Sequence, residues 1–170
     1  MNEQDRHELI ERHKREFSHV HIIRFFHAAV AIEYAGPMTD EEQAFSDAAV
    51  EKLGDFIWFH GGLSGRKVGD LLLPASETGS DPRGQNTATP DRTTHVYMSQ
   101  NQKEASKFAR WAEGDLYSID PIGVIEIDPT WLRLAMVMCV RGGGLLWQPK
   151  NHHLACDHWR CDRAEVVGIE

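Results

Sequence analysis

A histidine followed by two glycines closes the first apolar run in the central part of the chain. Residues 57–59 are Ile, Trp and Phe, and they lead directly into His60, Gly61 and Gly62. Because glycine has no Cβ, a ligand can lie close against its backbone N–H and C=O groups. A histidine adds a neutral donor or acceptor at physiological pH. The pattern predicts a polar, ligand-accepting strand end; the alternative is a histidine that caps a strand before a glycine turn.

A second candidate lies in the segment THVYMSQNQKEASKFA (94–109), where a short strand-like run enters a polar turn and then a helix. If Val96 and Met98 face one side of a strand, His95 and Tyr97 face the other. A tyrosine at a strand end offers a flat, amphipathic surface to a planar ring. The alternative is that Tyr97 packs in the core.

Five side chains of zinc-ligand type lie close together near the end of the chain. They are His152, His153, Cys156, His158 and Cys161. A structural zinc needs four such ligands in a closed tetrahedron, which this segment could supply. The segment lacks a Cys-x-x-Cys pair and is short for a two-knuckle site. The alternative is a polar loop that Trp147 and Trp159 pack down.

The elements that would position these residues differ before and after residue 55. Residues 3–16 and 19–36 are predicted to be two helices, the first charged and the second apolar on nearly all sides. Thr39 and Glu42 form a capping box for a third helix, whose apolar residues recur at three- and four-residue spacing. We therefore predict an N-terminal helical segment over residues 1–55.

After residue 55 the pattern changes to short, β-branched or alternating runs, which predict strands. These runs are 56–60, 94–99, 122–128, 133–140 and 164–170. A helix is predicted over 101–114, and 74–94 has the composition of a long surface loop. The predicted fold class is α+β, with a sheet-rich body over residues 56–170 that follows the helical segment.

The composition fits a soluble, globular protein. The chain has 170 residues, of which 41% are hydrophobic and 26% charged, and a chain of this size can bury enough surface without a disulfide or a metal. The net charge of −8 disfavours non-specific binding to nucleic acid. There is no apolar run of the ~20 residues that a membrane span needs, and the charged N-terminus is unlike a secretory signal. We expect a cytoplasmic protein without a membrane partner, whose three cysteines are free thiols or ligands.

Five pieces of the sequence, taken in order, resemble NAD-dependent ADP-ribosyltransferases of the His-Tyr-Glu type, related to diphtheria toxin and the poly(ADP-ribose) polymerases. The pieces are His60-Gly61, Val68–Leu72, His95–Ser99, Ile125–Pro129 and Val166–Glu170. The small bacterial rifamycin ADP-ribosyltransferases are the most similar group: they have a tyrosine-histidine-glycine start, an IGDLL element, a HIYFS strand, a strand ending in Glu-Pro and a late IVGVVE strand. The resemblance covers about residues 56–170 and implies the split-sheet fold of that family.

The resemblance also implies that NAD is a substrate, and it suggests how NAD is held without a metal. His60 would bind the adenosine ribose, and the backbone of Gly61 would bind the nicotinamide carboxamide. Tyr97 would stack on the nicotinamide ring, and Phe108 would complete the sandwich from the next helix. Arg66 could face the pyrophosphate with its fork of donors, or it could be a solvated loop charge.

The catalytic carboxylate has three candidates. In this family the third residue of the triad often opens a late strand, which favours Glu165. Such a carboxylate would stabilise an oxocarbenium-like transition state and help to deprotonate the acceptor. In the rifamycin enzymes the acid instead follows the Glu-Pro strand, where residues 130–135 contain none. Asp128 and Glu126 are the alternatives, and Glu165 could also be a solvated residue on an edge strand.

The function implied by the resemblance is transfer of ADP-ribose from NAD to an acceptor with release of nicotinamide, and His60, Tyr97 and Glu165 form the expected catalytic set. The acceptor could be a rifamycin-type antibiotic, which would make the protein a resistance enzyme. It could equally be a protein or a nucleic acid, as in toxin and phage relatives. The alternative class is a non-catalytic module that binds NAD or zinc.

Overall fold

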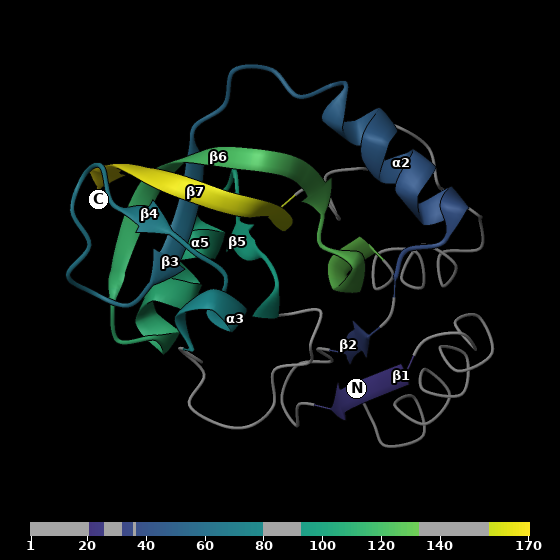
Figure 1. Ribbon diagram of the computed structural model, residues 1–170, viewed down its shortest axis with the longest axis horizontal. Helices are drawn as coiled ribbons and strands as arrows, with labels where there is room; N and C mark the ends of the chain where they lie inside the picture. The colour runs from purple at the N-terminus through teal and green to yellow at the C-terminus, as the bar shows by residue number, and fades with distance from the viewer. Residues whose placement is uncertain (1–20, 26–31, 36, 80–92, 133–156) are drawn as a thin grey trace.

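The computed structural model describes residues 21–25, 32–35, 37–79, 93–132 and 157–170, which Figure 1 draws as coloured ribbon. Three helices and seven strands lie within these ranges. The architecture is therefore mixed α+β, as the sequence predicts. No helix in the described part of the chain is long and apolar enough to cross a membrane.

The two earliest described segments form a β-hairpin. Strand β1 (His21–Phe25) pairs antiparallel with β2 (Ile32–Ala35) as a two-stranded sheet. The helix predicted over residues 19–36 is therefore wrong in both segments. They are rich in Ile, Phe and Tyr, which favour strands, and an apolar stretch without a clear period does not distinguish a strand from a buried helix. The helix predicted over 3–16 lies outside the described residues.

Five further strands form a single sheet that carries the rest of the fold. Antiparallel neighbours follow the order β3 (Trp58–Gly62), β6 (Asp115–Ile127), β7 (Trp159–Ile169) and β4 (Leu71–Leu72), and β5 (Val96–Met98) also pairs with β7. In Figure 1, β6 and β7 run side by side across the upper part of this body. Four of the five predicted strands are confirmed within these elements. The fifth, 133–140, lies outside the described residues.

One isolated bridge joins β3 to β5 and so closes the sheet on itself. Phe59 and Ser99 exchange two backbone hydrogen bonds, at 2.8 and 2.9 Å. One face of the closed sheet is filled by buried side chains, among which the rings of Trp58 and Trp159 pack edge to face with centroids 5.6 Å apart. The other strand residues of this core are Leu72, Val96, Met98, Tyr117, Ile119, Ile127, Cys161, Ala164 and Val166.

Helix α2 (Asp40–Val50) begins at the predicted capping box and packs against β6. Thr39 Oγ1 accepts the Glu42 N–H at 3.2 Å, and a Glu42 carboxylate oxygen accepts the Thr39 N–H at 2.9 Å. Further along the helix, Ser46 Oγ accepts the Ile127 N–H at 3.0 Å, and Ala49 joins the core of the sheet. The helix is thus fixed to the sheet by both an apolar and a polar contact.

Helix α5 (Gln102–Trp111) confirms the helix predicted over 101–114 and packs on β3. The Asn101 side chain caps it by accepting the backbone N–H groups of Lys103 and Glu104. Within the predicted loop 74–94, residues Ala75–Thr78 form a single helical turn, α3. Residues 80–92 of that loop lie outside the described part of the chain.

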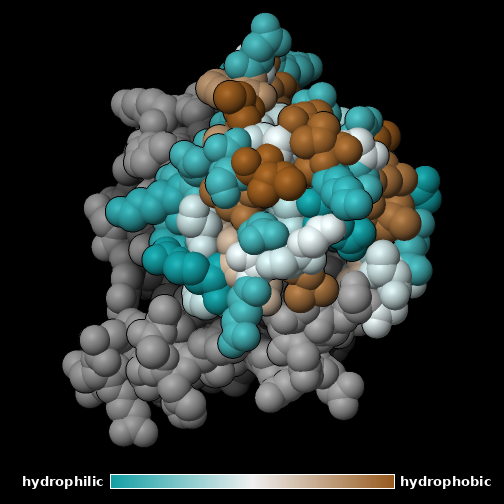
Figure 2. Space-filling model, turned by 90° about the vertical axis from the view of Figure 1, so that its left-hand side faces the viewer, coloured by the Kyte–Doolittle hydropathy of each residue, from teal (hydrophilic) through white to brown (hydrophobic). Residues whose placement is uncertain are grey.

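Apolar side chains also reach the surface on the side of the molecule where β4 and the C-terminus lie. Figure 2 shows brown, apolar groups between polar ones on this face. The exposed large apolar residues of the loop after β3, of β4 and of the end of β7 are Leu63, Val68, Leu71, Val167 and Ile169. They lie outside the buried core described above.

Candidate functional site

Beyond the Phe59–Ser99 bridge, β3 presents a backbone donor and acceptor that the sheet does not use. In an antiparallel pair, alternate residues direct their N–H and C=O groups to the same neighbour. Since Phe59 bonds Ser99 of the β5 segment, Gly61 directs its own N–H and C=O to that side, away from β6. No hydrogen bond of Gly61 on that side is found within the described residues. A ligand could therefore pair with Gly61 as a strand would.

The structure requires a glycine at each of the two positions after His60, for different reasons. A Cβ on Gly61 would lie 2.2 Å from the Ala105 carbonyl oxygen and 2.4 Å from the Ala109 nitrogen, so the bare glycine lets α5 pack onto β3. A Cβ on Gly62 would lie 2.6 Å from His60 Nε2, so the second glycine leaves room for the imidazole. The sequence suggests ligand access as the reason for glycine, and the structure adds these two packing reasons.

His60 is held as a neutral imidazole with one free acceptor. Its Nδ1 lies 2.7 Å from the Tyr97 carbonyl oxygen, and since a carbonyl only accepts, Nδ1 carries the proton and donates. Burial lowers the pKa of His60, and the positive charge of Arg66 lowers it further, against the opposing effect of the Tyr97 hydrogen bond. Nε2 then carries a lone pair, and it has no hydrogen-bond partner among the described residues.

The loop after β3 brings Arg66 to the same side as His60. The Tyr117 hydroxyl donates to the Leu63 carbonyl at 2.7 Å and accepts the Arg66 N–H at 3.4 Å, which fixes the loop over β6. Burial raises the pKa of Tyr117, so its hydroxyl keeps its proton. The Arg66 charge is felt at His60, as its pKa shows. Sequence alone does not indicate Tyr117, because its role depends on its position directly opposite His60 across the sheet.

Tyr97 lies on the opposite face of the sheet from His60. On β5, Tyr97 is paired with Arg160 of β7, which is paired in turn with Glu126 of β6. Residues directly opposite each other in a sheet share a face, so these three side chains form one row. Alternation from the Phe59–Ser99 bridge places Tyr97 on the Gly61 face and His60 on the other. The side chains of His60 and Tyr97 are therefore on different faces, and the contact between the two residues is the hydrogen bond from the His60 ring to the Tyr97 backbone carbonyl.

Phe108 belongs to an aromatic group beside α5. Its ring makes edge-to-face contacts with Trp111 and His158, with centroids 5.2 and 5.9 Å away. His158 in turn stacks on Trp131 at 3.8 Å. Since His158 precedes Trp159, whose partner on β5 is Met98, this group lies near the bridged end of β5. A sandwich of a nicotinamide ring between Phe108 and Tyr97 stays a prediction.

The three predicted carboxylates lie in different surroundings. Glu126 is mostly buried in the Tyr97 row, where Arg160 Nε donates to its Oε1 at 2.7 Å. Asp128 is buried, and its Oδ1 accepts the Thr130 N–H at 2.9 Å, so it caps a turn. Glu165 is exposed on β7, paired with Leu71 and with Asp120.

Position along β7 separates Glu165 from the Tyr97 row. Glu165 is five residues beyond Arg160, which is roughly 16 Å along a strand. The structure therefore brings Glu126, and not Glu165, into line with Tyr97. Arg160 has no signal in the sequence as a site residue, because its pairing with Glu126 depends on a register between distant segments.

The predicted zinc ligands are only partly described. His152, His153 and Cys156 lie outside the described residues. Cys161 is buried, with its Sγ 3.0 Å from the Arg163 carbonyl oxygen, and burial raises its pKa to about 12. Among the described residues, no three side chains of metal-ligand type lie close enough together to hold an ion.

Comparison with known proteins adds no assignment. No family model matches the chain, and no curated protein matches it at a significant level. A proposal for function therefore depends on the residues and their geometry.

Proposed function

We propose that this protein transfers ADP-ribose from NAD to an acceptor and releases nicotinamide. The observation that carries the proposal is at the end of β3, where the N–H and C=O of Gly61 and the neighbouring Nε2 of His60 have no hydrogen-bond partner among the residues that the structure describes. A primary carboxamide has a donor and an acceptor side by side, so it can pair with both groups of one residue. A ribose hydroxyl can donate to His60 Nε2.

The surroundings of this strand end supply the other parts of a dinucleotide site. Tyr97 lies on the neighbouring strand segment, on the Gly61 face, and offers a ring for stacking. Arg66 acts electrostatically on His60 and is a suitable partner for a pyrophosphate. Phe108 on α5 is the proposed second aromatic contact. A mixed α+β body built on an antiparallel sheet is compatible with the ADP-ribosyltransferase fold that the resemblance implies.

The chemistry needs no redox step. The bond between the nicotinamide nitrogen and ribose C1′ breaks, and nicotinamide leaves with the electron pair. A nucleophilic oxygen or nitrogen of the acceptor bonds to C1′ and gives up its proton. A carboxylate near the ribose stabilises the positive charge that develops, which is the role expected of Glu165 from the resemblance. A rifamycin-type drug is the first acceptor to test, and the net charge of −8 disfavours a nucleic acid.

The test is nicotinamide release from NAD, measured first with water as acceptor and then with a rifamycin. His60→Asn keeps a donor for the Tyr97 carbonyl but removes the free ring nitrogen. Tyr97→Leu removes the ring, whereas Tyr97→Phe keeps it. We expect release to fall by about 10²-fold in His60→Asn and Tyr97→Leu, and to change little in Tyr97→Phe.

A matched control and a binding measurement make the result specific. Glu77→Gln alters an exposed ion pair with Arg163 and should leave the rate unchanged. Calorimetric titration with NAD and with nicotinamide reports binding apart from catalysis. A folded wild-type protein that neither binds NAD nor releases nicotinamide would exclude the proposed function. Bound zinc in such a protein would favour the binding-module alternative.

A further inference from the structure

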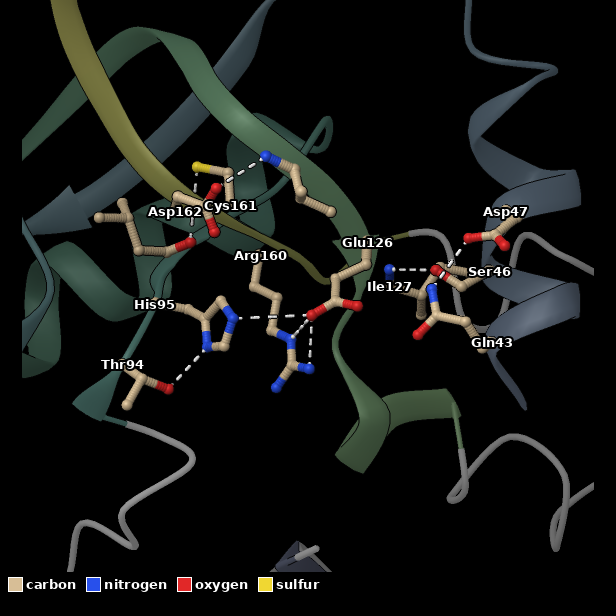
Figure 3. A network of polar contacts seen from close by, with 12 residues as sticks. Gln43, Ser46, Asp47, Thr94, His95, Glu126, Ile127, Arg160, Cys161 and Asp162 are labelled. Atoms are coloured by element: carbon tan, nitrogen blue, oxygen red, sulfur yellow. Dashed lines mark hydrogen bonds and ion pairs between the residues drawn. The ribbon is translucent and has the colours of Figure 1, made fainter. Parts of the chain in front are cut away.

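A network of polar side chains surrounds Glu126 on the Tyr97 face of the sheet. Figure 3 shows Arg160 and His95 both directed at one oxygen of this carboxylate. Glu126 Oε1 lies 2.7 Å from Arg160 Nε, 2.5 Å from Arg160 Nη2 and 3.6 Å from His95 Nε2. The other ring nitrogen of His95 is 2.9 Å from Thr94 Oγ1. Three nitrogens therefore converge on a single carboxylate oxygen.

The three contacts all involve Glu126 Oε1 and none involves Oε2. A guanidinium and a carboxylate that serve only to neutralise each other commonly pair through two parallel hydrogen bonds, one to each oxygen. Here Glu126 Oε2 has no hydrogen-bond partner within the described residues, although the side chain is only 11% exposed. One oxygen is thus fixed and the other is open, an arrangement that suits a carboxylate that accepts a hydrogen bond from a hydroxyl group.

The position of this carboxylate relates it to the proposed nicotinamide site. Glu126, Arg160 and Tyr97 are consecutive partners across β6, β7 and β5. Two strand spacings separate Glu126 from Tyr97, or about 10 Å between their backbones, and side chains shorten that distance. His95, which contacts Glu126, is two residues from Tyr97 on the same strand face. A ribose attached to a ring stacked on Tyr97 lies within this span.

We propose that Glu126, oriented by Arg160 and His95, is the carboxylate of the proposed ADP-ribose transfer. This inference rests on the proposed function. Oε2 accepts a ribose hydroxyl and stabilises the charge at C1′ while the bond to nicotinamide breaks. The acceptor then bonds to C1′, and its proton passes to Oε2 and on to water. Arg160 and His95 are positioning residues, because they act through the carboxylate.

The experiment measures kcat and KM for NAD, from nicotinamide release, in four variants. Glu126→Gln keeps the shape of the side chain and should lower kcat by about 10²- to 10³-fold with little change in KM. Arg160→Lys and His95→Gln should lower kcat less, by about tenfold, again without a comparable change in KM. Glu126→Asp should recover part of the rate lost in Glu126→Gln. Glu77→Gln is the control, because its partner Arg163 forms an exposed pair of the same chemistry.

A wrong function and a wrong assignment of Glu126 would give different experimental results. If the wild type neither binds NAD nor releases nicotinamide, the proposed function is wrong. If the wild type is active and Glu126→Gln keeps its kcat within threefold while Glu165→Gln loses it, the assignment of Glu126 is wrong. If Glu126→Gln does not fold, the variant that also carries Arg160→Gln removes both charges of the pair. A folded double variant should be inactive, and activity in it would also refute the assignment.

Discussion

At the residue scale, His60, Gly61 and Gly62 have separate structural roles at the end of β3. The imidazole donates to the Tyr97 carbonyl, and Gly62 leaves space for that ring. Gly61 lets α5 approach, and within the described residues its N–H and C=O have no hydrogen-bond partner on the β5 side. The sequence indicates that something polar and closely approached lies here. It does not indicate that helix α5 packs against Gly61, because that contact depends on which segment folds back onto β3.

The pKa of His60 predicts a pH dependence of stability. Burial holds this pKa below its usual 6.5 in the folded protein. Well above pH 6.5 the ring is neutral in both the folded and the unfolded state. Between 6.5 and the lower folded value, the unfolded chain binds a proton that the folded protein does not, so the free energy of unfolding decreases as the pH falls. We expect His60→Asn to lose this part of the dependence.

The measurement is the free energy of unfolding in urea at pH 7.5 and at pH 5.5, for the wild type and for His60→Asn. The chain has ten histidines, and the background from the other nine cancels when the two proteins are compared. If the free energy of unfolding fell by the same amount in both proteins between pH 7.5 and pH 5.5, the role assigned to burial of His60 would be contradicted. A titration of the His60 ring followed by NMR would show the lowered pKa directly.

At the scale of elements, the sequence predicts a helix or a strand best where a full local pattern is present, such as a capping box or a short strand-like run. The capping box at Thr39 and Glu42 predicts the start of α2, and the strand-like run at 94–99 predicts β5. Residues 21–25 and 32–35 lie in an apolar stretch without a clear period, so the sequence predicts a helix where the structure has two strands. The pairing of Glu126 with Arg160 was not predictable either, because these residues are 34 positions apart and meet only through the register of β6 on β7.

The contact between α5 and β3 predicts that Gly61 tolerates no side chain. In Gly61→Ala the new methyl group would collide with backbone atoms of Ala105 and Ala109, which cannot rotate away. The helix must move off the strand, and we expect a loss of about 1–3 kcal/mol in the free energy of unfolding, or more. Urea denaturation followed by circular dichroism measures this loss.

Gly54→Ala is the matched control for this substitution. A Cβ on Gly54 would meet only a Phe56 ring carbon, at 3.7 Å, which is an ordinary contact. Its effect should stay within about 0.5 kcal/mol, as is usual for surface substitutions. If Gly61→Ala were as stable as Gly54→Ala, the close packing of α5 on β3 would be refuted.

At the scale of the whole molecule, β7 joins the parts of the sheet. It pairs with β6 along one edge and with both β5 and β4 along the other. Cys161 lies on this strand with no exposed surface, against the Val96 carbonyl of β5 and across from Ile125 of β6. Reagents can reach its sulfur only if β7 separates from its neighbours, so its reactivity should report the opening of the sheet.

We therefore predict that Cys161 reacts with a thiol reagent only through global unfolding. The other two cysteines, Cys139 and Cys156, are first replaced by serine so that a single thiol remains. At pH 8, a buried thiol with a pKa of about 12 is almost entirely protonated and unreactive. The labelling rate should rise with urea along the same slope as the free energy of unfolding of this double variant, and the fully unfolded chain should label at once. Fast labelling at a rate independent of urea would instead show that β7 opens locally, and the sheet would then not be the cooperative unit that its pairing indicates.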